Sequence, residues 1–263
     1  MINLFTNLSY VTQAFIATIF TWSITALGAA VVFVFKKTNK NIMDAMLGFA
    51  AGVMIASSFF SLLSPAIEMT KSLNLITWLV TFIGFFSGGL LLFIGDKLFE
   101  RLIQNNQKGS IKRSLMLITS ITLHNIPEGM AVGVAFGSLA YGIEGATIGA
   151  ACMLALGIGI QNFPEGTAVS VPLRREGMSL KRAFFFGQLS GIVEPISGVI
   201  GALLVIKIRI LLPYLLSFAA GAMIYVVVQE LIPQSQTNEK KDLMALFTMI
   251  GFSLMMILDV AFS

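Results

Sequence analysis

The sequence predicts an all-α integral membrane protein with eight transmembrane helices. Hydrophobic residues make up 56% of its 263 residues and charged residues only 11%, whereas a soluble domain carries about 25% charged residues. Apolar runs recur along the whole length, and each is apolar on nearly every face instead of along one stripe. Because one bilayer crossing takes about 20 residues, these runs leave no room for a separate soluble domain. We therefore expect a single transmembrane domain over residues 1–263.

The helices are expected at the apolar runs, with polar connections between them. The first run is too long for the apolar region of a signal peptide and has no basic segment before it, so it is read as the first transmembrane helix. The longest connection, about 99–112, is polar and contains no histidine. The predicted helices cover residues 10–35, 43–68, 74–98, 113–137, 145–172, 180–205, 210–232 and 241–261.

Basic residues predict the orientation in the membrane. Only Lys71, Lys207 and Arg209 fall on one side of the predicted bundle, and the other Lys and Arg residues fall on the opposite side. Because positive loops are retained in the cytoplasm, the basic connections face inward and both termini are extracytoplasmic, as in a multi-pass cell membrane protein. These clusters are topology signals and contacts to the lipid bilayer, and no nucleic acid partner is expected. The basic side contains Lys36, Lys37, Lys40, Lys97, Arg101, Lys108, Lys112, Arg113, Arg174, Arg175, Lys181, Arg182, Lys240 and Lys241.

Two related hexapeptides lie in the predicted fourth and fifth helices. His-Asn-Ile-Pro-Glu-Gly at 124–129 contains the only histidine, and Gln-Asn-Phe-Pro-Glu-Gly follows at 161–166. Residues four apart share a helix face, so the first and fifth residues of each hexapeptide face the same way. The second residue lies about 100° round the helix and can reach a neighbouring subsite. These residues are His124 with Glu128, Gln161 with Glu165, and the amides Asn125 and Asn162.

Three carboxylates lie deep in predicted helices without a basic residue to neutralise them: Glu128, Glu165 and Glu194. Each charged group at this depth costs at least ~2.5–3.5 kcal/mol, so the three need protons, water or bound cations. The prolines of the hexapeptides also free backbone carbonyls, as is typical of helices that line a polar cavity. Imidazole, amide and carboxylate donors together suit a borderline divalent ion such as zinc. A histidine that only bonds across helices, or repeats that only kink and pack, explains the combination less well.

These segments resemble the ZIP (Zrt/Irt-like) family of divalent metal transporters over essentially the full length. The two hexapeptides carry the resemblance most specifically, and Gly-Gln-Leu-Ser-Gly-Ile-Val-Glu-Pro at 187–195 supports it. The segments 50–62 and 229–233 are also similar to the second and seventh helices of the family. Gln161, in place of histidine, resembles the prokaryotic GufA-like branch.

The resemblance implies a transport site between the fourth and fifth helices. One metal ion would be held by His124, Glu128, Gln161 and Glu165, with Met54 nearby. A second would use Asn125, Asn162 and Glu194, with Glu128 and Glu165 bridging. Met54 taken alone is a packing residue, since the chain has 14 methionines. Asn162 departs from the aspartate that is common in the branch, which weakens the case for a permanently filled second site. The 99–112 connection also lacks the histidine-rich segment of many relatives.

The expected function is therefore transport of zinc, and also of iron(II), manganese or cadmium, into the cytoplasm. The resemblance implies alternating access by an elevator-like movement, with the first three and last three helices as inverted repeats around the fourth and fifth, and a homodimer. The transported Zn²⁺ is the cargo, and no catalytic cofactor is expected. A metal-selective channel using the same ligands is the first alternative. An intramembrane metalloenzyme is the second, although the sequence has no HExxH motif.

Overall fold

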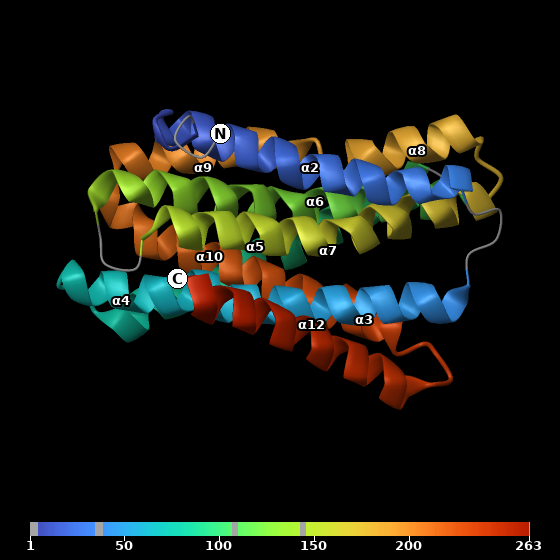
Figure 1. Ribbon diagram of the computed structural model, residues 1–263. Coiled ribbons are helices and arrows are strands. Elements are labelled where there is room, and N and C mark those ends of the chain that lie inside the picture. The colour runs from blue at the N-terminus through green and yellow to red at the C-terminus, as the bar shows by residue number, and fades with distance from the viewer. Residues whose placement is uncertain (1–4, 35–38, 107–109, 143–145, 263) are drawn as a thin grey trace.

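The computed structural model describes residues 5–34, 39–106, 110–142 and 146–262, and among these residues it contains helices and no strands. Figure 1 shows long helices that run side by side. Six helical segments are long and apolar enough to cross a membrane, which agrees with the predicted class. They are Tyr10–Val34, Lys40–Ser72, Thr77–Leu98, Leu180–Lys207, Arg209–Ser235 and Lys241–Ala261.

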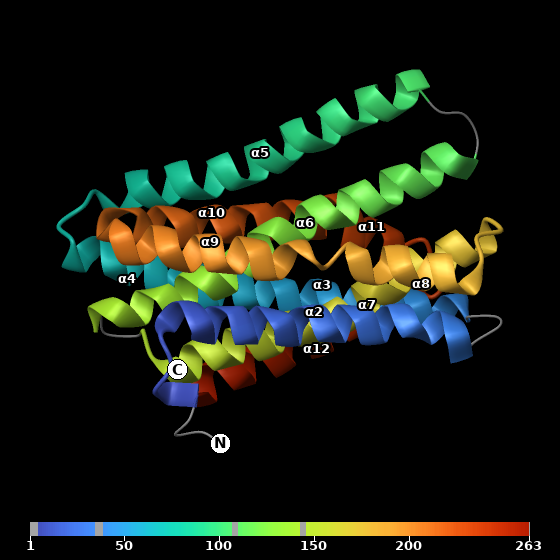
Figure 2. The ribbon, with the colours of Figure 1, turned by 90° about the horizontal axis from the view of Figure 1, so that it is seen from above.

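The helices follow one another with short connections. Two of the helices contain a π-helical turn, η1 and η4. The helix between residues 180 and 207 is interrupted before Val193, where Figure 2 shows a short non-helical stretch between α8 and α9. The elements are α2 (Tyr10–Val34), α3 (Lys40–Ser57), η1 (Ser58–Leu63), α4 (Ser64–Ser72), α5 (Thr77–Asn106), α6 (Ser110–Ser138), η2 (Leu139–Tyr141), α7 (Ile148–Arg175), α8 (Leu180–Leu189), α9 (Val193–Lys207), η3 (Arg209–Leu211), α10 (Leu212–Val226), η4 (Val227–Leu231), α11 (Ile232–Ser235) and α12 (Lys241–Phe262).

Each predicted helix corresponds to a helical segment of the structure, with ends that differ by a few residues. The largest difference is at the predicted 99–112 connection, since α5 continues to Asn106 and α6 begins at Ser110. The rest of that connection, 107–109, lies outside the described residues, as do Lys36, Lys37 and Lys108. The helices α6 and α7 have 29 and 28 residues, but they contain the polar hexapeptides and are not among the six apolar spans.

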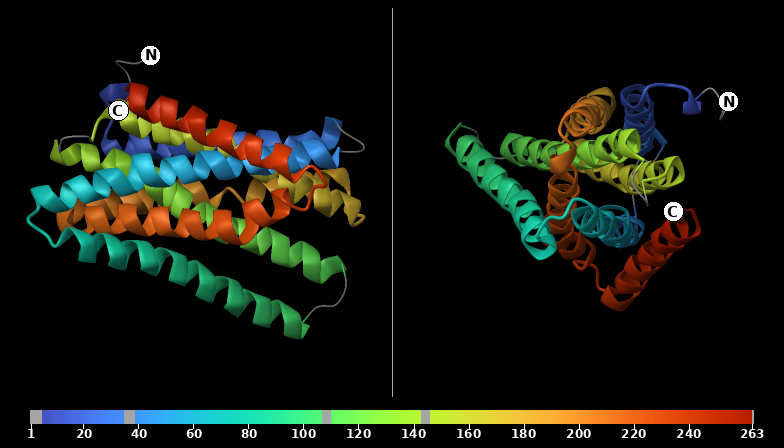
Figure 3. Two further views of the ribbon diagram at one scale, coloured as in Figure 1. Left: turned by 90° about the horizontal axis from the view of Figure 1, so that it is seen from below. Right: turned by 90° about the vertical axis from the view of Figure 1, so that its left-hand side faces the viewer.

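The helices form two groups. One group consists of α2, α6, α7, α8 and α9, which pack chiefly against one another, and the other consists of α3, α5, α10 and α12 with the short α4 and α11. We call them the first and second group. The end-on view in Figure 3 shows the first group lying over the second. The groups meet where α7 and α6 of the first contact α3 and α10 of the second.

Within each group, glycines allow helix backbones to touch. A Cβ atom added at Gly28 of α2 would lie 2.0 Å from the carbonyl oxygen of Phe163 in α7. In the second group, a Cβ atom at Gly52 of α3 would lie 1.9 Å from the carbonyl oxygen of Thr248 in α12. Neither position has room for any other residue, because backbone cannot move aside as a side chain can.

Glycines at the boundary between the groups meet side chains instead. The nearest atoms to a Cβ added at Gly157 of α7 belong to the flexible Met255 side chain of α12, with Sδ at 2.3 Å. A Cβ added at Gly95 of α5 would meet only the Leu123 Cδ1 atom of α6, at 3.5 Å. At both of these glycines the nearest neighbours lie in the opposite group. At these two positions the groups therefore meet through side chains, whereas Gly28 and Gly52 meet backbone atoms inside their groups.

Candidate metal-binding site

The polar residues of the hexapeptides are buried in the first group and reach its boundary with the second group, where His124 contacts Glu230 of η4. Both hexapeptides lie in continuous helices, with Pro127 inside α6 and Pro164 inside α7. The third carboxylate enters from the first turn of α9. At most 5% of each of these seven residues is exposed: His124, Asn125, Glu128, Gln161, Asn162, Glu165 and Glu194. The structure thus brings together the seven polar residues that the sequence singled out.

The first part of the cluster joins α6, α7 and η4. The Gln161 Nε2 atom donates a hydrogen bond to Glu128 Oε1 at 2.7 Å. His124 Nδ1 lies 3.1 Å from Glu230 Oε2. From the sequence, Glu230 is predicted near the inner end of its helix, where it would either attract metal at the exit or be a solvated helix-end charge. In the structure its side chain is only 15% exposed and contacts the histidine. The π-helical turn η4 carries Glu230.

Glu230 was therefore not predicted as a neighbour of the site. One signal was present, because Glu230 stands shortly before a proline, Pro233, as the other buried glutamates stand next to one. The signal was weak because nothing local indicates that the end of one helix lies against the middle of another. That proximity follows from the packing of α10 against α6.

The second part of the cluster surrounds Glu194. The Asn162 Nδ2 atom lies 3.0 and 2.9 Å from the two oxygens of Glu194, and 3.3 Å from the carbonyl oxygen of Thr21. Two hydroxyls of α2 also donate to this carboxylate, from Thr21 and from Thr25 at 3.3 Å. These α2 threonines were not predicted. They supply the hydrogen bonds that a buried carboxylate requires when no cation is bound.

Asn125 stabilises the interruption between α8 and α9. Its Nδ2 atom donates to the carbonyl oxygen of Ser190 at 2.9 Å, the C-cap residue that follows the last residue of α8. The indole of Trp22 donates to the neighbouring carbonyl of Gln188 at 2.9 Å. Carbonyls at a helix end lack intrahelical partners, so these donors allow a buried break next to Glu194.

Several buried polar atoms of the cluster have no hydrogen-bond partner. A buried polar atom without a partner costs about 1–3 kcal/mol, so their concentration in one place calls for an additional ligand. Glu128, Glu165 and Glu194 also lie close enough for their charges, when ionised, to repel one another. The unpartnered atoms are His124 Nε2, Asn125 Oδ1, Glu128 Oε2, Gln161 Oε1, Asn162 Oδ1 and both carboxylate oxygens of Glu165.

This arrangement is not a closed metal site. In the described part of the chain, no three His, Cys, Asp or Glu side chains converge closely enough to surround an ion. The amide groups of Gln161 and Asn162 stand among the carboxylates and donate N–H groups to them. Turning either amide by half a turn would present its oxygen instead. The donor set therefore suits a cation. The two amides can donate N–H groups to the carboxylates when no cation is bound, and can present their oxygens when one is bound.

Met54 lies in the apolar core. It is fully buried in α3 and packs within the main hydrophobic cluster. The carbonyl oxygen of Met54 accepts the Ser58 hydroxyl at 2.7 Å. A role as a sulfur ligand remains a prediction.

Fold and site together define a helical membrane protein with an acidic, amide-rich cluster buried between its helices. The family model of the ZIP Zinc transporter matches residues 103–259. The chain is 38% identical to Zinc transporter ZIP11 of Bos taurus over 96% of this chain and 98% of that protein. It is 36% identical to Zinc transporter ZupT of Streptococcus mutans, covering 92% and 94% of the two chains. It is also 34% identical to Zinc transporter GufA of Myxococcus xanthus, covering 94% and 97%.

The protein belongs to the ZIP zinc transporter family, and the resemblance to its GufA-like branch is confirmed. The relatives named here are transporters, which places the chain in a family of transporters and not of enzymes.

Proposed function

We propose that this protein transports divalent transition metal ions, zinc foremost and also iron(II), manganese or cadmium, into the cytoplasm. Family membership supports transport as the function, and the names of the relatives support zinc as the transported ion. The observation that carries the proposal is the buried concentration of unpartnered nitrogen and oxygen atoms on α6 and α7. These atoms lie in the first group, away from any exposed surface, as expected for a site that opens to only one side at a time.

The proposed first metal site uses His124 Nε2 and the oxygens of Glu128, Gln161 and Glu165, with Met54 nearby. Glu230 holds the opposite ring nitrogen of His124 at 3.1 Å, which orients Nε2 toward the ion. Metal-bound histidines commonly have such a second partner, and its loss costs about 10–100-fold in affinity or activity. On metal binding, the Gln161 amide exchanges its N–H bond to Glu128 for coordination through oxygen.

The proposed second site lies beside it, at Asn125, Asn162 and Glu194, with Glu128 and Glu165 bridging. Here the hydrogen bonds from Asn162 and the α2 threonines already satisfy the Glu194 carboxylate. A metal ion must displace them, so we expect this site to be weaker than the first.

We further propose that α6 and α7 also cross the membrane, which gives eight transmembrane helices with the basic ends in the cytoplasm. Their length supports this, and the polar hexapeptides explain their lower hydropathy. A shared feature supports inverted repeats of the first and last three helices. The second helix of each unit contains a π-helical turn followed by a proline at the second position of the next helix, Pro65 after η1 and Pro233 after η4. We also expect a homodimer.

The two helix groups support an elevator-like mechanism. Backbone contacts at glycines hold each group together, while the nearest contacts at Gly157 and Gly95 between the groups are side chains. Sliding of the first group would break no backbone interlocking at these positions. We therefore propose that the first group carries the metal along the second.

Zinc uptake into proteoliposomes tests the proposed site. Uptake should fall at least tenfold in His124→Ala and Glu165→Ala, because each removes a proposed ligand. The matched control is Glu239→Gln, which neutralises an exposed glutamate in the connection before α12. Equal uptake by both variants and wild type would refute the site assignment. Uptake that saturates at micromolar zinc with a fixed turnover would support a carrier over a channel.

Cross-linking tests the movement. In a Cys152→Ser background, Gly157→Cys and Met255→Cys place thiols across the boundary between the groups. Cross-linking these two cysteines with a short bifunctional thiol reagent should abolish zinc uptake by the variant. The control pair, Gly159→Cys and Phe20→Cys, joins α7 to α2 within the first group, where the Phe20 ring lies 3.0 Å from a Cβ added at Gly159. Full transport by the efficiently cross-linked Gly157–Met255 pair would rule out the sliding movement.

A further inference from the structure

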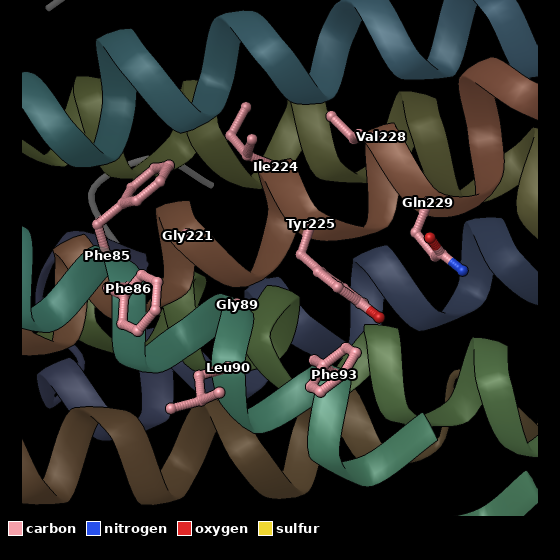
Figure 4. Close-up of a pocket in the computed structure, with 10 residues that line it drawn as sticks. All are labelled: Phe85, Phe86, Gly89, Leu90, Phe93, Gly221, Ile224, Tyr225, Val228 and Gln229. Atoms are coloured by element: carbon pink, nitrogen blue, oxygen red, sulfur yellow. The ribbon is translucent and has the colours of Figure 1, made fainter. Parts of the chain in front are cut away.

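A groove separates the middle of α5 from α10 and η4 on the outer surface of the second group. Its volume is about 420 Å³, within the range of ~300–1,000 Å³ typical of ligand sites. Figure 4 shows Tyr225 extending from α10 toward Phe93 of α5, with the Gln229 amide further along. The walls are otherwise apolar, from Phe86 and Leu90 on one side to Val228 on the other.

We propose that this groove binds one acyl chain of an anionic membrane phospholipid, with the headgroup at Lys97 and Arg101. Phe86, Leu90 and Val228 are 57%, 42% and 63% exposed. In a membrane-spanning helix such exposed apolar side chains face hydrocarbon, so the groove opens to lipid tails and not to water. An acyl chain is the ligand of matching chemistry that the surroundings supply.

Gly89 forms part of the groove and leaves it open. A Cβ atom added there would meet only ordinary contacts, the Gly221 carbonyl oxygen at 3.5 Å and Tyr225 Cβ at 3.7 Å. The preceding glycine is different, because a Cβ at Gly88 would lie 2.0 Å from the carbonyl oxygen of Phe218. Gly88 therefore allows α5 and α10 to approach closely. The missing side chain at Gly89 instead leaves space that no protein atom fills.

Charge complementarity identifies the headgroup. Lys97 lies four residues after Phe93 and Arg101 four residues further, so both continue the groove face toward the end of α5. Both are exposed. Basic residues at a membrane surface attract anionic lipids by about 1 kcal/mol each. An apolar groove with two basic residues beyond its end, on the same face of α5, matches a phospholipid that carries a net negative charge.

The groove also borders the polar cluster. Tyr225 hydrogen-bonds to Asp96 of α5, and Val228 and Gln229 belong to the same π-helical turn as Glu230. An acyl chain between α5 and η4 would support this turn and hence the contact of Glu230 with His124. Any effect on uptake rests on the proposed function, whereas lipid binding itself does not.

Photolabelling tests the binding. The full chain is placed in nanodiscs with phosphatidylglycerol that carries a diazirine in mid-chain, and labelled peptides are identified by mass spectrometry. Labels should concentrate in 85–93 and 221–229, at least fivefold above the equally lipid-exposed α12. Gly89→Leu should remove this excess by filling the groove. Leu91→Phe, which adds bulk on an exposed position outside the groove, should leave it unchanged.

Two results would overturn the proposal: equal labelling of α5 and α12 in wild type, or an undiminished excess in Gly89→Leu. Should Gly89→Leu fail to fold, competition by unlabelled phosphatidylglycerol on wild type replaces it, and labels that do not fall with competitor count against a site. A separate experiment tests the assignment of the headgroup to Lys97 and Arg101. The double variant Lys97→Gln and Arg101→Gln should reduce phosphatidylglycerol labelling to the level of phosphatidylcholine, and equal labelling by both lipids in wild type would overturn it.

Discussion

Replacement of Asn162 by aspartate tests the proposed second metal site most directly. In the structure its amide nitrogen lies 3.0 and 2.9 Å from both oxygens of Glu194. Asn162→Asp keeps the size of the side chain but replaces the donor with a second carboxylate. Two carboxylates then face each other without a donor between them, beside the carbonyl oxygen of Thr21.

The size of the effect follows from this geometry. Two unit charges about 3 Å apart repel by ~5 kcal/mol at an effective dielectric constant of ~20. Protonation of one carboxyl limits the penalty, since protonating an ordinary aspartate at pH 7 costs about 4 kcal/mol. The metal-free variant should therefore be less stable by up to ~4 kcal/mol, and a divalent ion between the carboxylates removes that repulsion. Recovery of only half of it, ~2 kcal/mol, corresponds to about 30-fold tighter zinc binding at this site.

The assay is thermal unfolding of the detergent-solubilised protein with and without zinc, together with the bound metal per chain measured by elemental mass spectrometry. Asn162→Asp should melt below wild type without metal, gain more stability from zinc than wild type does, and bind a second ion. Asn162→Leu is the control, because it loses the same hydrogen bonds but adds no ligand. An unchanged stoichiometry, with the same zinc stabilisation as Asn162→Leu, would refute position 162 as a ligand.

Two further predictions follow from other contacts. Glu230→Gln removes the charge beside His124 Nδ1, so zinc uptake should fall about 10–100-fold while the melting temperature in the absence of metal changes little; uptake at the wild-type level would mean that this contact does not orient the histidine. Gly133→Ala should lower the free energy of unfolding by at least ~1–3 kcal/mol, because its Cβ would lie 1.9 Å from the carbonyl oxygen of Gly198. Gly157→Ala should cost less in the same denaturation series, since a methionine side chain can move aside, and an equal loss in both variants would contradict the difference between the two kinds of contact.

Much of the fold was predictable because a bilayer imposes a simple rule on sequence. Each crossing needs a long apolar run, and the six apolar spans of the described residues lie at predicted runs, even where the structure places π-helical turns inside them. The helix ends were less predictable. The polar segment after residue 98 was expected as a connection, but α5 continues to Asn106, since helical hydrogen bonding does not stop where apolar side chains do.

The seven polar residues of the site were also predictable, because unpaired carboxylates in apolar helices require a reason. Their partners were not. Thr21 and Thr25 are ordinary residues in an apolar helix, and only the packing of α2 against α9 brings their hydroxyls to Glu194. Asn125 was predicted as a ligand, yet its amide nitrogen bonds to the helix break at Ser190, which no local pattern announces.

By itself the sequence determined the membrane class, the order of the helices and the residues that carry unusual polar groups. Tertiary structure decided which polar groups meet, that Glu230 contacts His124, and how the helices divide into two groups. The physical reason is the distance along the chain between the residues that each property involves. Hydropathy and helix periodicity are local properties of the chain, whereas hydrogen bonds between helices and close contacts at Gly28 or Gly52 depend on atoms more than 100 residues away. Those distant contacts decide which helices pack into each of the two groups.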